Sequence, residues 1–228
     1  MLVEPLRDEG LLALDRAVVE AVQARLRAGT RTGPDADAIA LRALLAEGVD
    51  RSSARVLKAV LGRIEATAGG GIVACGPASA MLAAERFGDS RKVVGEPEEA
   101  LAQARVGGRA VIDLGMPRPW WGRLLAMPDL RVIAALPDDV LGRPQALMVS
   151  LKPSGPTGDD RTFWVTDSGA SDVRIVEALG QAGLAATPLH AAGGLKLFML
   201  AGYVQGEDGR LATAPGTLKG VIGAAPVF

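Results

Sequence analysis

The chain has 228 residues and a formal net charge of -1, enough length for one large domain or two to three small ones. Hydrophobic residues make up 49%, which predicts a packed core, and the near-neutral charge argues against a nucleic-acid-binding protein. No apolar run approaches the roughly 18 residues of a membrane span, and the acidic, proline-containing N-terminus is unlike a secretory signal. One cysteine and one histidine exclude an internal disulfide and a two-histidine metal site. We therefore expect a cytoplasmic protein without metal or cofactor.

Residues 1–69 have the periodicity of three helices. They are expected from about Leu6 to Ala28, from Asp35 or Asp37 to Gly48, and from Asp50–Ser53 to about Thr67. In the first helix, Leu11, Leu14 and Val18 form one apolar face and Arg25 continues it.

This segment resembles the all-helical chorismate mutase domain, because Leu14-Asp15 and Arg25 have the spacing of that family's first helix. The resemblance implies a dimer whose site is built from two chains, with arginines that hold the two carboxylates of chorismate. The candidate catalytic residues are Arg25, Arg7 and Arg42. The position of the family's first-helix arginine is occupied here by Asp8. The position of its second-helix Arg-Glu pair is occupied by Ala40-Leu41. Three further basic residues are possible substitutes or, alternatively, solvated surface charges: Arg55, Lys58 and Arg63.

Residues 70–158 alternate between strand and helix patterns, which predicts a largely parallel sheet. Strands are expected at 71–74, 92–94, 110–114, 130–136 and 145–151. Helices are expected after Ser79, over 96–105, and from Pro119-Trp120-Trp121 to Ala126. The two tryptophans are predicted either to pack in the core and at a helix end or to form a partner surface. Cys75 is interpreted as inert packing.

This lobe resembles the first lobe of prephenate dehydratase, on Gly76-Pro77-Ala78-Ser79 followed by Ala83-Ala84. Gly76, Pro77 and Ser79 are candidate ligand-binding residues, since a Gly/Ser turn at a helix N-terminus can hold an anion. Asp113-Leu114-Gly115-Met116 replaces the family's Pro-Ile-Glu-Asn segment. Only a short segment separates Leu136 from Leu147, so the second lobe is missing and dehydratase activity is expected to be absent.

Residues 159–228 predict a strand at 161–167, a helix capped by Ser171 or Asp172, strands at 184–190 and 195–204, and a last strand at 221–228. The order and three motifs resemble the amino-acid-sensing ACT domain that ends the bifunctional chorismate mutase–prephenate dehydratase. The motifs are Arg161-Thr162-Phe163-Trp164-Val165, Val176-Glu177-Ala178-Leu179 and Ile222-Gly223-Ala224-Ala225-Pro226-Val227. The family's effector motifs fall on Val173, Arg174, His190 and Gly193, which makes these candidate ligand-binding residues for an amino-acid effector. For His190 a packed, hydrogen-bonded role is the alternative.

The sequence therefore predicts an α+β protein with three domains: helical (1–69), α/β (70–158) and ACT-like (159–228). Two functions stay open. One is a relative of the chorismate mutase–prephenate dehydratase family, with weak or lost catalysis, that binds a small anionic metabolite. The other is an active chorismate mutase with a rearranged arginine site. In both cases we expect a homodimer without nucleic-acid or membrane partners.

Overall fold

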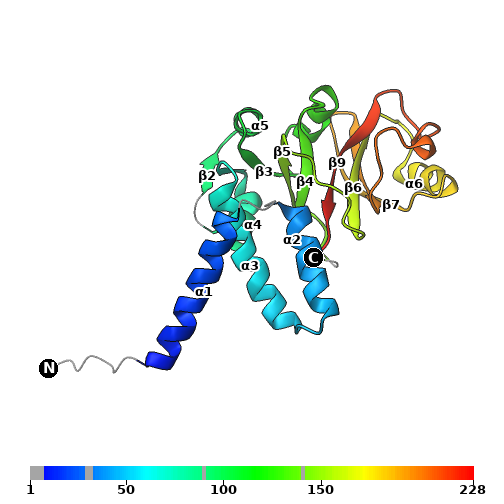
Figure 1. Cartoon of the computed structure of the whole chain (residues 1–228). Coiled ribbons are helices and arrows are strands. Elements are labelled where there is room, and N and C mark those ends of the chain that lie inside the picture. The colour runs from blue at the N-terminus through cyan, green and yellow to red at the C-terminus, as the bar shows by residue number, and fades with distance from the viewer. Residues whose placement is uncertain (1–7, 29–32, 89–90, 140–141) are drawn as a thin grey trace.

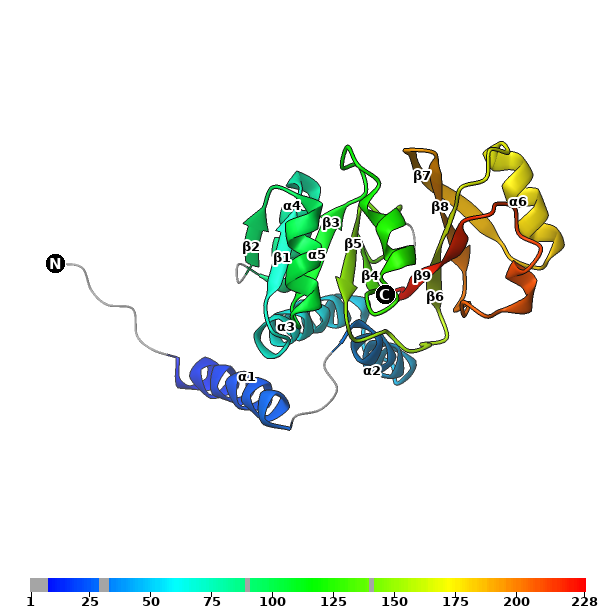
Figure 2. The same ribbon diagram turned by 90° about the horizontal axis from the view of Figure 1, so that it is seen from above.

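The computed structural model describes residues 8–28, 33–88, 91–139 and 142–228, and shows a mixed α and β protein built on one nine-stranded sheet (Figure 1). The helices at the N-terminal end lie below the sheet, and three further α-helices and a 3₁₀ helix cover its faces (Figures 1 and 2). Within these ranges no helix is both long enough and apolar enough to cross a membrane.

The first three helices are α1 (Glu9–Arg27), α2 (Pro34–Ala46) and α3 (Arg51–Ala68). Asp50 caps α3, because its side chain accepts from the backbone N–H groups of Ser52 and Ser53. α2 and α3 form a hairpin against the sheet, whereas α1 projects away from it (Figure 1). No residue of α1 is buried, and Leu11, Leu14 and Val18 are 61%, 65% and 60% exposed. The apolar face of α1 is therefore mostly exposed, although Val18 and Val22 line a groove with α3.

The first part of the sheet has the strand order β2-β1-β3-β5-β4, and α4 and α5 cover opposite faces. The elements are β1 (Ile72–Cys75), α4 (Pro77–Phe87), β2 (Arg91–Val94), α5 (Pro97–Arg105), β3 (Arg109–Asp113), the 3₁₀ helix η1 (Trp120–Ala126), β4 (Arg131–Leu136) and β5 (Ala146–Ser150). β1 pairs parallel with β2 and β3, as expected for strands joined by crossover helices.

The prediction of a largely parallel sheet is wrong at β5. β5 lies between β3 and β4 and is antiparallel to both. No helix separates β4 from β5 in the described part of the connection, and a connection without a crossover helix suits antiparallel neighbours.

The second part of the sheet has the order β9-β6-β8-β7, and all of its pairs are antiparallel. The elements are β6 (Asp160–Thr166), α6 (Asp172–Gln181), β7 (Ala186–Ala192), β8 (Leu195–Ala201), the 3₁₀ helix η2 (Gly209–Leu211) and β9 (Lys219–Pro226). The side chains of β6 alternate: Phe163 and Val165 face the cluster around η1, while Trp164 packs with the residues of α6. The predicted strands at 161–167 and 195–204 thus lie side by side in one sheet.

β9 joins the two parts of the sheet, since it pairs with β6 on one side and parallel to β4 on the other. Gly223 stands opposite Val132 at this seam, with a φ of +140°. A Cβ atom here would lie 2.3 Å from the carbonyl oxygen of Val132, so only glycine allows the close approach. The sheet is continuous across residue 158, and the division into three domains stays a prediction.

Candidate functional site

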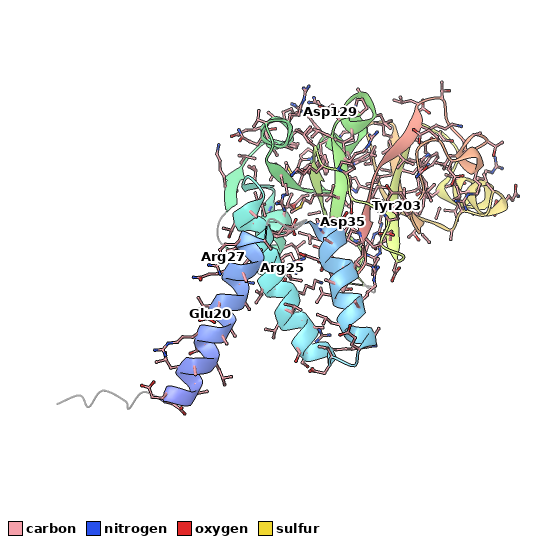
Figure 3. The ribbon with its side chains drawn as sticks, in the orientation of Figure 1. Glu20, Arg25, Arg27, Asp35, Asp129 and Tyr203 are labelled. Carbon is pink, nitrogen blue, oxygen red and sulfur yellow. The ribbon has the colours of Figure 1, made fainter. Side chains whose placement is uncertain are left out.

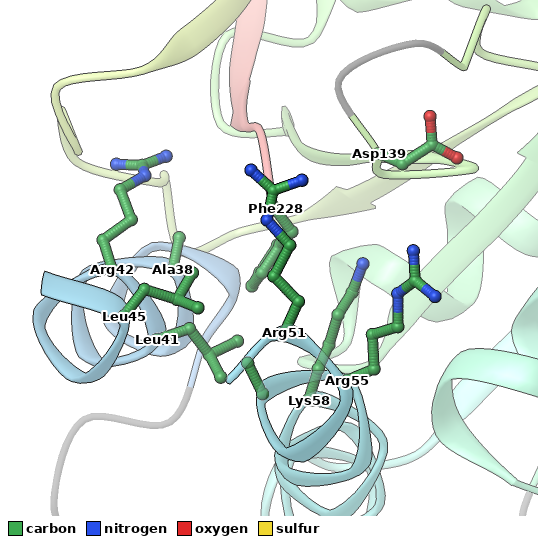
Figure 4. A pocket seen from close by; sticks show the side chains of 10 residues that line it. Ala38, Leu41, Arg42, Leu45, Arg51, Arg55, Lys58, Asp139 and Phe228 are labelled. Carbon is green, nitrogen blue, oxygen red and sulfur yellow. The ribbon is translucent and has the colours of Figure 1, made fainter. Parts of the chain in front are cut away.

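A cavity of about 650 Å³ lies between α2 and α3 and is closed by Phe228, which follows β9 (Figure 4). Four basic residues and one acid contribute its charges: Arg42, Arg51, Arg55, Lys58 and Asp139. The walls between them are apolar: Ala38, Leu41, Leu45, Ala54 and the ring of Phe228. We call this cavity the helical pocket.

Helix geometry gathers three of the four cations. Arg51, Arg55 and Lys58 are spaced four and three residues apart on α3, and such positions share one face. Figure 4 shows their charged ends directed the same way, toward Asp139. Arg55 and Lys58 were predicted from the sequence as possible substitutes for the mutase arginines, whereas Arg51 was not predicted. The four-residue spacing between Arg51 and Arg55 was the signal that could have identified Arg51.

Two of the cations already have partners. Arg42 donates from Nη2 to the carbonyl oxygens of Asp159 (2.8 Å) and Val227 (2.7 Å), and from Nη1 to both oxygens of Thr157. Lys58 forms a short ion pair with Asp138. The side chains of Arg51 and Arg55, in contrast, have no hydrogen bond or ion pair within the described ranges. Both are exposed, so their donors are available to a ligand.

Buried charges fix the floor of the helical pocket. Arg86 of α4 is 7% exposed and lies 3.2 Å from Asp138 and 3.6 Å from Asp37 of α2. Burial raises the pKa of Asp37, although Arg86 and Arg25 oppose the rise. The ring of Phe228 lies 4.7 Å from Nζ of Lys58 and 5.2 Å from the guanidinium carbon of Arg86. These contacts therefore hold α2, α3, α4 and Phe228 together beneath the pocket.

This arrangement is suited to binding rather than to proton transfer. An anion with an apolar body would place its charges against Arg51, Arg55 and Lys58 and its body against Leu41 and Phe228. The lining contains one acid, Asp139, and no histidine or cysteine. Leu41 has no polar atom to donate to a reacting oxygen.

The structure does not bring Arg25 into the helical pocket. Arg25 lines a separate groove of about 540 Å³ between α1 and α3, whose other lining side chains are mostly apolar. Its Nη2 lies 3.4 Å from Oδ1 of Asp37, and its side chain is 34% exposed (Figure 3). Arg7 lies outside the described residues. Arg63 is exposed and donates to the carbonyl oxygen of Ala59 within α3.

The predicted anion site at the N-terminus of α4 already holds a carboxylate of this chain. Asp113, at the end of β3, accepts from the backbone N–H groups of Ala78 (3.1 Å) and Ser79. The Ser79 hydroxyl donates to the carbonyl oxygen of Gly76, and a Cβ on Gly76 would lie 2.3 Å from the Asp113 carboxylate. Pro77 occupies the first position of α4.

The predicted effector residues lie on two elements. Val173 and Arg174 are exposed in the first turn of α6. His190 on β7 meets the ring of Trp121 edge-on at 6.4 Å, and Gly193 lies in the turn before β8, close to Pro119. For His190, this contact matches the packing alternative.

The aromatic and thiol groups of the α/β part belong to the core. Trp120 and Trp121 are 1% and 0% exposed, and Nε1 of Trp120 donates to the carbonyl oxygen of Asp113 at 2.7 Å. The core interpretation of the tryptophans is therefore correct. Cys75 is fully buried, and burial raises the pKa of its thiol to about 11, which leaves it protonated and unreactive. The described residues contain no group of three or more His, Cys, Asp and Glu side chains arranged to hold a metal ion.

Comparison with known proteins adds a distant structural neighbour. No family model and no curated protein matches the chain. Among solved structures, a protein titled a novel type of quorum-quenching acylase (GqqA) aligns with 69% of this chain and 95% of its own. The identity is 15% and the TM-score is 0.46, and a likeness of this degree carries no argument about function.

Proposed function

We propose that the protein binds a small anionic metabolite of the chorismate or prephenate type in the helical pocket, and that its catalysis is weak or lost. One observation carries this proposal: Arg51 and Arg55 lack partners within the described ranges and face an apolar cavity beside Lys58. Cations without partners next to apolar walls suit a ligand with carboxylates on a ring.

The same pocket argues against efficient turnover. Rearrangement of chorismate needs a donor at the breaking ether oxygen, and Leu41 lies in the lining where the family resemblance expects a polar pair. Arg25 lies in another groove and is paired with Asp37.

The strand order gives further support to a relationship with the chorismate mutase–prephenate dehydratase family. An antiparallel β9-β6-β8-β7 arrangement with α6 on one face suits an ACT-like unit. The chain passes from β4 to β5 without room for a second lobe, so we expect no phenylpyruvate formation from prephenate. The single, buried Cys75 remains the ground for proposing a cytoplasmic location.

We further propose a homodimer formed through α1. Leu11, Leu14 and Val18 repeat at helical spacing and are all more than half exposed. Light scattering at micromolar concentration should give twice the monomer mass for the parent chain. A double variant Leu14→Lys/Val18→Lys should give the monomer mass, because the buried face would then carry charge. A monomeric parent would contradict the proposal.

The binding proposal is tested by isothermal titration with prephenate and with chorismate at low salt. We expect saturable binding to the parent chain and about hundredfold weaker binding to the double variant Arg51→Gln/Arg55→Gln, since each lost charged hydrogen bond costs about tenfold. Arg63→Gln is the matched control, because Arg63 is an exposed arginine of α3 outside the pocket lining. Equal affinity of all three proteins would refute the proposal.

The alternative function is an active chorismate mutase. The exposed face of α1 favours it, because a second chain docked on α1 would bring its own arginines toward the arginines of the first chain. Loss of chorismate absorbance measures this directly. A rate near that of a competent enzyme, abolished by Arg25→Ala, would favour the mutase over the binding protein.

A further inference from the structure

A second cavity, of about 860 Å³, lies at the amino ends of β1 and β3. This is the edge of the sheet opposite to the N-terminus of α4, which follows the carboxyl end of β1. Its walls come from five places: the start of α2, the end of α3 with the Gly69–Gly70 turn, Gly107 with the start of β3, Ile133 of β4, and the end of β5 with the segment 151–154. We call it the edge cavity.

The edge cavity is lined by two acids and two bases, namely Asp35, Glu65, Arg109 and Lys152. Glu65 is 1% exposed and Arg109 is 6% exposed. Arg109 donates to Oε1 of Glu65 in a short ion pair and to the backbone carbonyl oxygen of the same residue at 2.9 Å. A Cβ on Gly69 would overlap the Arg109 guanidinium, so the glycine turn makes room for this pair.

Two polar atoms of the lining have no hydrogen-bond partner among the described residues: Oε2 of Glu65 and Oγ of Ser154. A buried polar group without a partner is costly and uncommon in folded proteins. Ser154 is 7% exposed, and its backbone carbonyl oxygen accepts from the hydroxyl of Tyr203 at 3.3 Å. The neighbouring Gly155 N–H donates to Oδ2 of Asp35 at 3.0 Å. The bond to Asp35 holds the segment against the start of α2, and the bond from Tyr203 holds it against the chain that follows β8; Figure 3 labels both Asp35 and Tyr203.

We propose that the edge cavity binds a small zwitterion that carries one carboxylate and one ammonium group, as a free amino acid does. The ammonium group donates to Oε2 of Glu65 and to Asp35. The carboxylate accepts from Lys152 and from the hydroxyl of Ser154. Ile133, Leu151 and Pro153 offer apolar contact to the remainder of the ligand.

The balance of charge selects this class of ligand. Glu65 and Arg109 pair with each other, so Asp35 and Lys152 are the charges of the lining without an ion-pair partner in the described chain. An anion alone would leave Asp35 without a cation, and a cation alone would leave Lys152 without an anion. The helical pocket differs, because it gathers four bases and one acid. The inference stands independently of the function proposed for the helical pocket.

The test is calorimetric titration of the full chain with each of the protein amino acids, followed by the N-acetyl and the amide forms of the tightest. We expect at least one amino acid to bind with a Kd below about 1 mM, and each single-charge form to bind about tenfold or more weakly. Lys152→Gln and Ser154→Ala should each weaken binding about tenfold. Lys152 is exposed, so its replacement leaves the fold intact.

Two controls locate the site. Lys92 is another exposed lysine and does not line the edge cavity, so Lys92→Gln should leave amino-acid binding unchanged. Arg51→Gln/Arg55→Gln should also leave it unchanged, although this variant weakens anion binding about hundredfold if the helical pocket works as proposed. The inference is overturned if no amino acid binds at about 10 mM. It is also overturned if binding survives both Lys152→Gln and Ser154→Ala, or if it is lost only with Arg51 and Arg55.

Discussion

The N-terminus of α4 and the helical pocket both gather positive potential, but a carboxylate of the chain meets the donors of the first, whereas in the second Asp138 pairs with Lys58 and leaves two arginines without an acceptor in the described chain. At α4 the donors are backbone N–H groups, and Asp113 accepts from two of them. In the helical pocket the donors are arginine side chains, and Arg51 and Arg55 have no acceptor within the described ranges. A helix N-terminus that meets a buried carboxylate serves stability, whereas exposed guanidinium groups beside an apolar cavity are left for a ligand.

This difference predicts which substitutions change stability and which change binding. Removal of a charge that is paired within the chain should lower the free energy of unfolding. Removal of a charge without an internal partner should lower the affinity for a ligand and hardly change the free energy of unfolding.

The largest effect is expected for Asp113→Ala, which removes the acceptor of two backbone donors at α4. Each charged hydrogen bond contributes about 1.5–3 kcal/mol, so the unfolding free energy should fall by about 4 kcal/mol. Urea unfolding monitored by circular dichroism measures it. Inorganic phosphate should raise the Tm of this variant more than that of the parent, because the freed donors form an anion site. A variant as stable as the parent would remove the basis of the comparison.

The next largest effect is a dependence of the unfolding free energy on pH, caused by Glu65. Burial raises its pKa to about 7, against the opposing pull of Arg109. A carboxyl whose folded pKa lies above its unfolded value stabilises the fold at low pH, and this contribution is lost as pH rises through the folded pKa. Unfolding free energy should therefore fall between pH 4.5 and 7, by about 3 kcal/mol from this group alone.

The control for this dependence is Glu65→Gln, which keeps the shape and cannot ionise. Urea titrations at several pH values should give a flatter profile for the variant than for the parent. Asp37, whose pKa is also raised, contributes in the same direction and is present in both proteins. Parallel profiles would show that Glu65 remains ionised in its pair with Arg109.

Local signals in the sequence predicted the elements but not the pairing of their charges. The Asp50 and Ser171 caps placed the starts of α3 and α6 closely, because capping depends on neighbours in sequence. The Asp113 carboxylate reaches the N-terminus of α4 from a distant strand, and no periodicity encodes that contact. The sequence therefore suggested an open anion site at Gly76, Pro77 and Ser79 where the structure shows an occupied one.

The antiparallel insertion of β5 was missed for a similar reason. A buried strand such as Ala146–Ser150 has the same apolar pattern in either direction, so direction is set by the connection and by the neighbouring strands. The helical pocket was foreseen only in part, since Arg55 and Lys58 were named as substitutes and their meeting with Phe228 depends on the path of β9.

A smaller effect is expected for Arg42→Met, which separates the two kinds of charge within one pocket. Arg42 donates to carbonyl oxygens of residues 157, 159 and 227, and their loss should cost about 2 kcal/mol of unfolding free energy. Arg51→Gln/Arg55→Gln, measured in the same urea titration, should change it by less than about 0.5 kcal/mol. Equal losses of unfolding free energy in the two variants would mean that the hydrogen bonds of Arg42 do not stabilise the fold.

The smallest effect is expected for Arg25→Gln, and it decides between the two proposed functions. Arg25 is one-third exposed, and its 3.4 Å contact with Asp37 is weaker than a normal charged hydrogen bond. Arg86 also neutralises Asp37, so loss of Arg25 leaves that carboxylate with a cation. We therefore expect a stability change below about 1 kcal/mol, as for partly exposed ion pairs, and a change in anion affinity below about twofold. Calorimetric titration of the parent and of Arg25→Gln with prephenate measures the change in affinity, and urea unfolding of the same two proteins measures the change in stability. If Arg25→Gln instead weakens binding tenfold without loss of stability, Arg25 must reach the ligand, which within one chain it does not. That result would require a second chain to supply Arg25 to the helical pocket, as expected of a mutase site shared between two protomers.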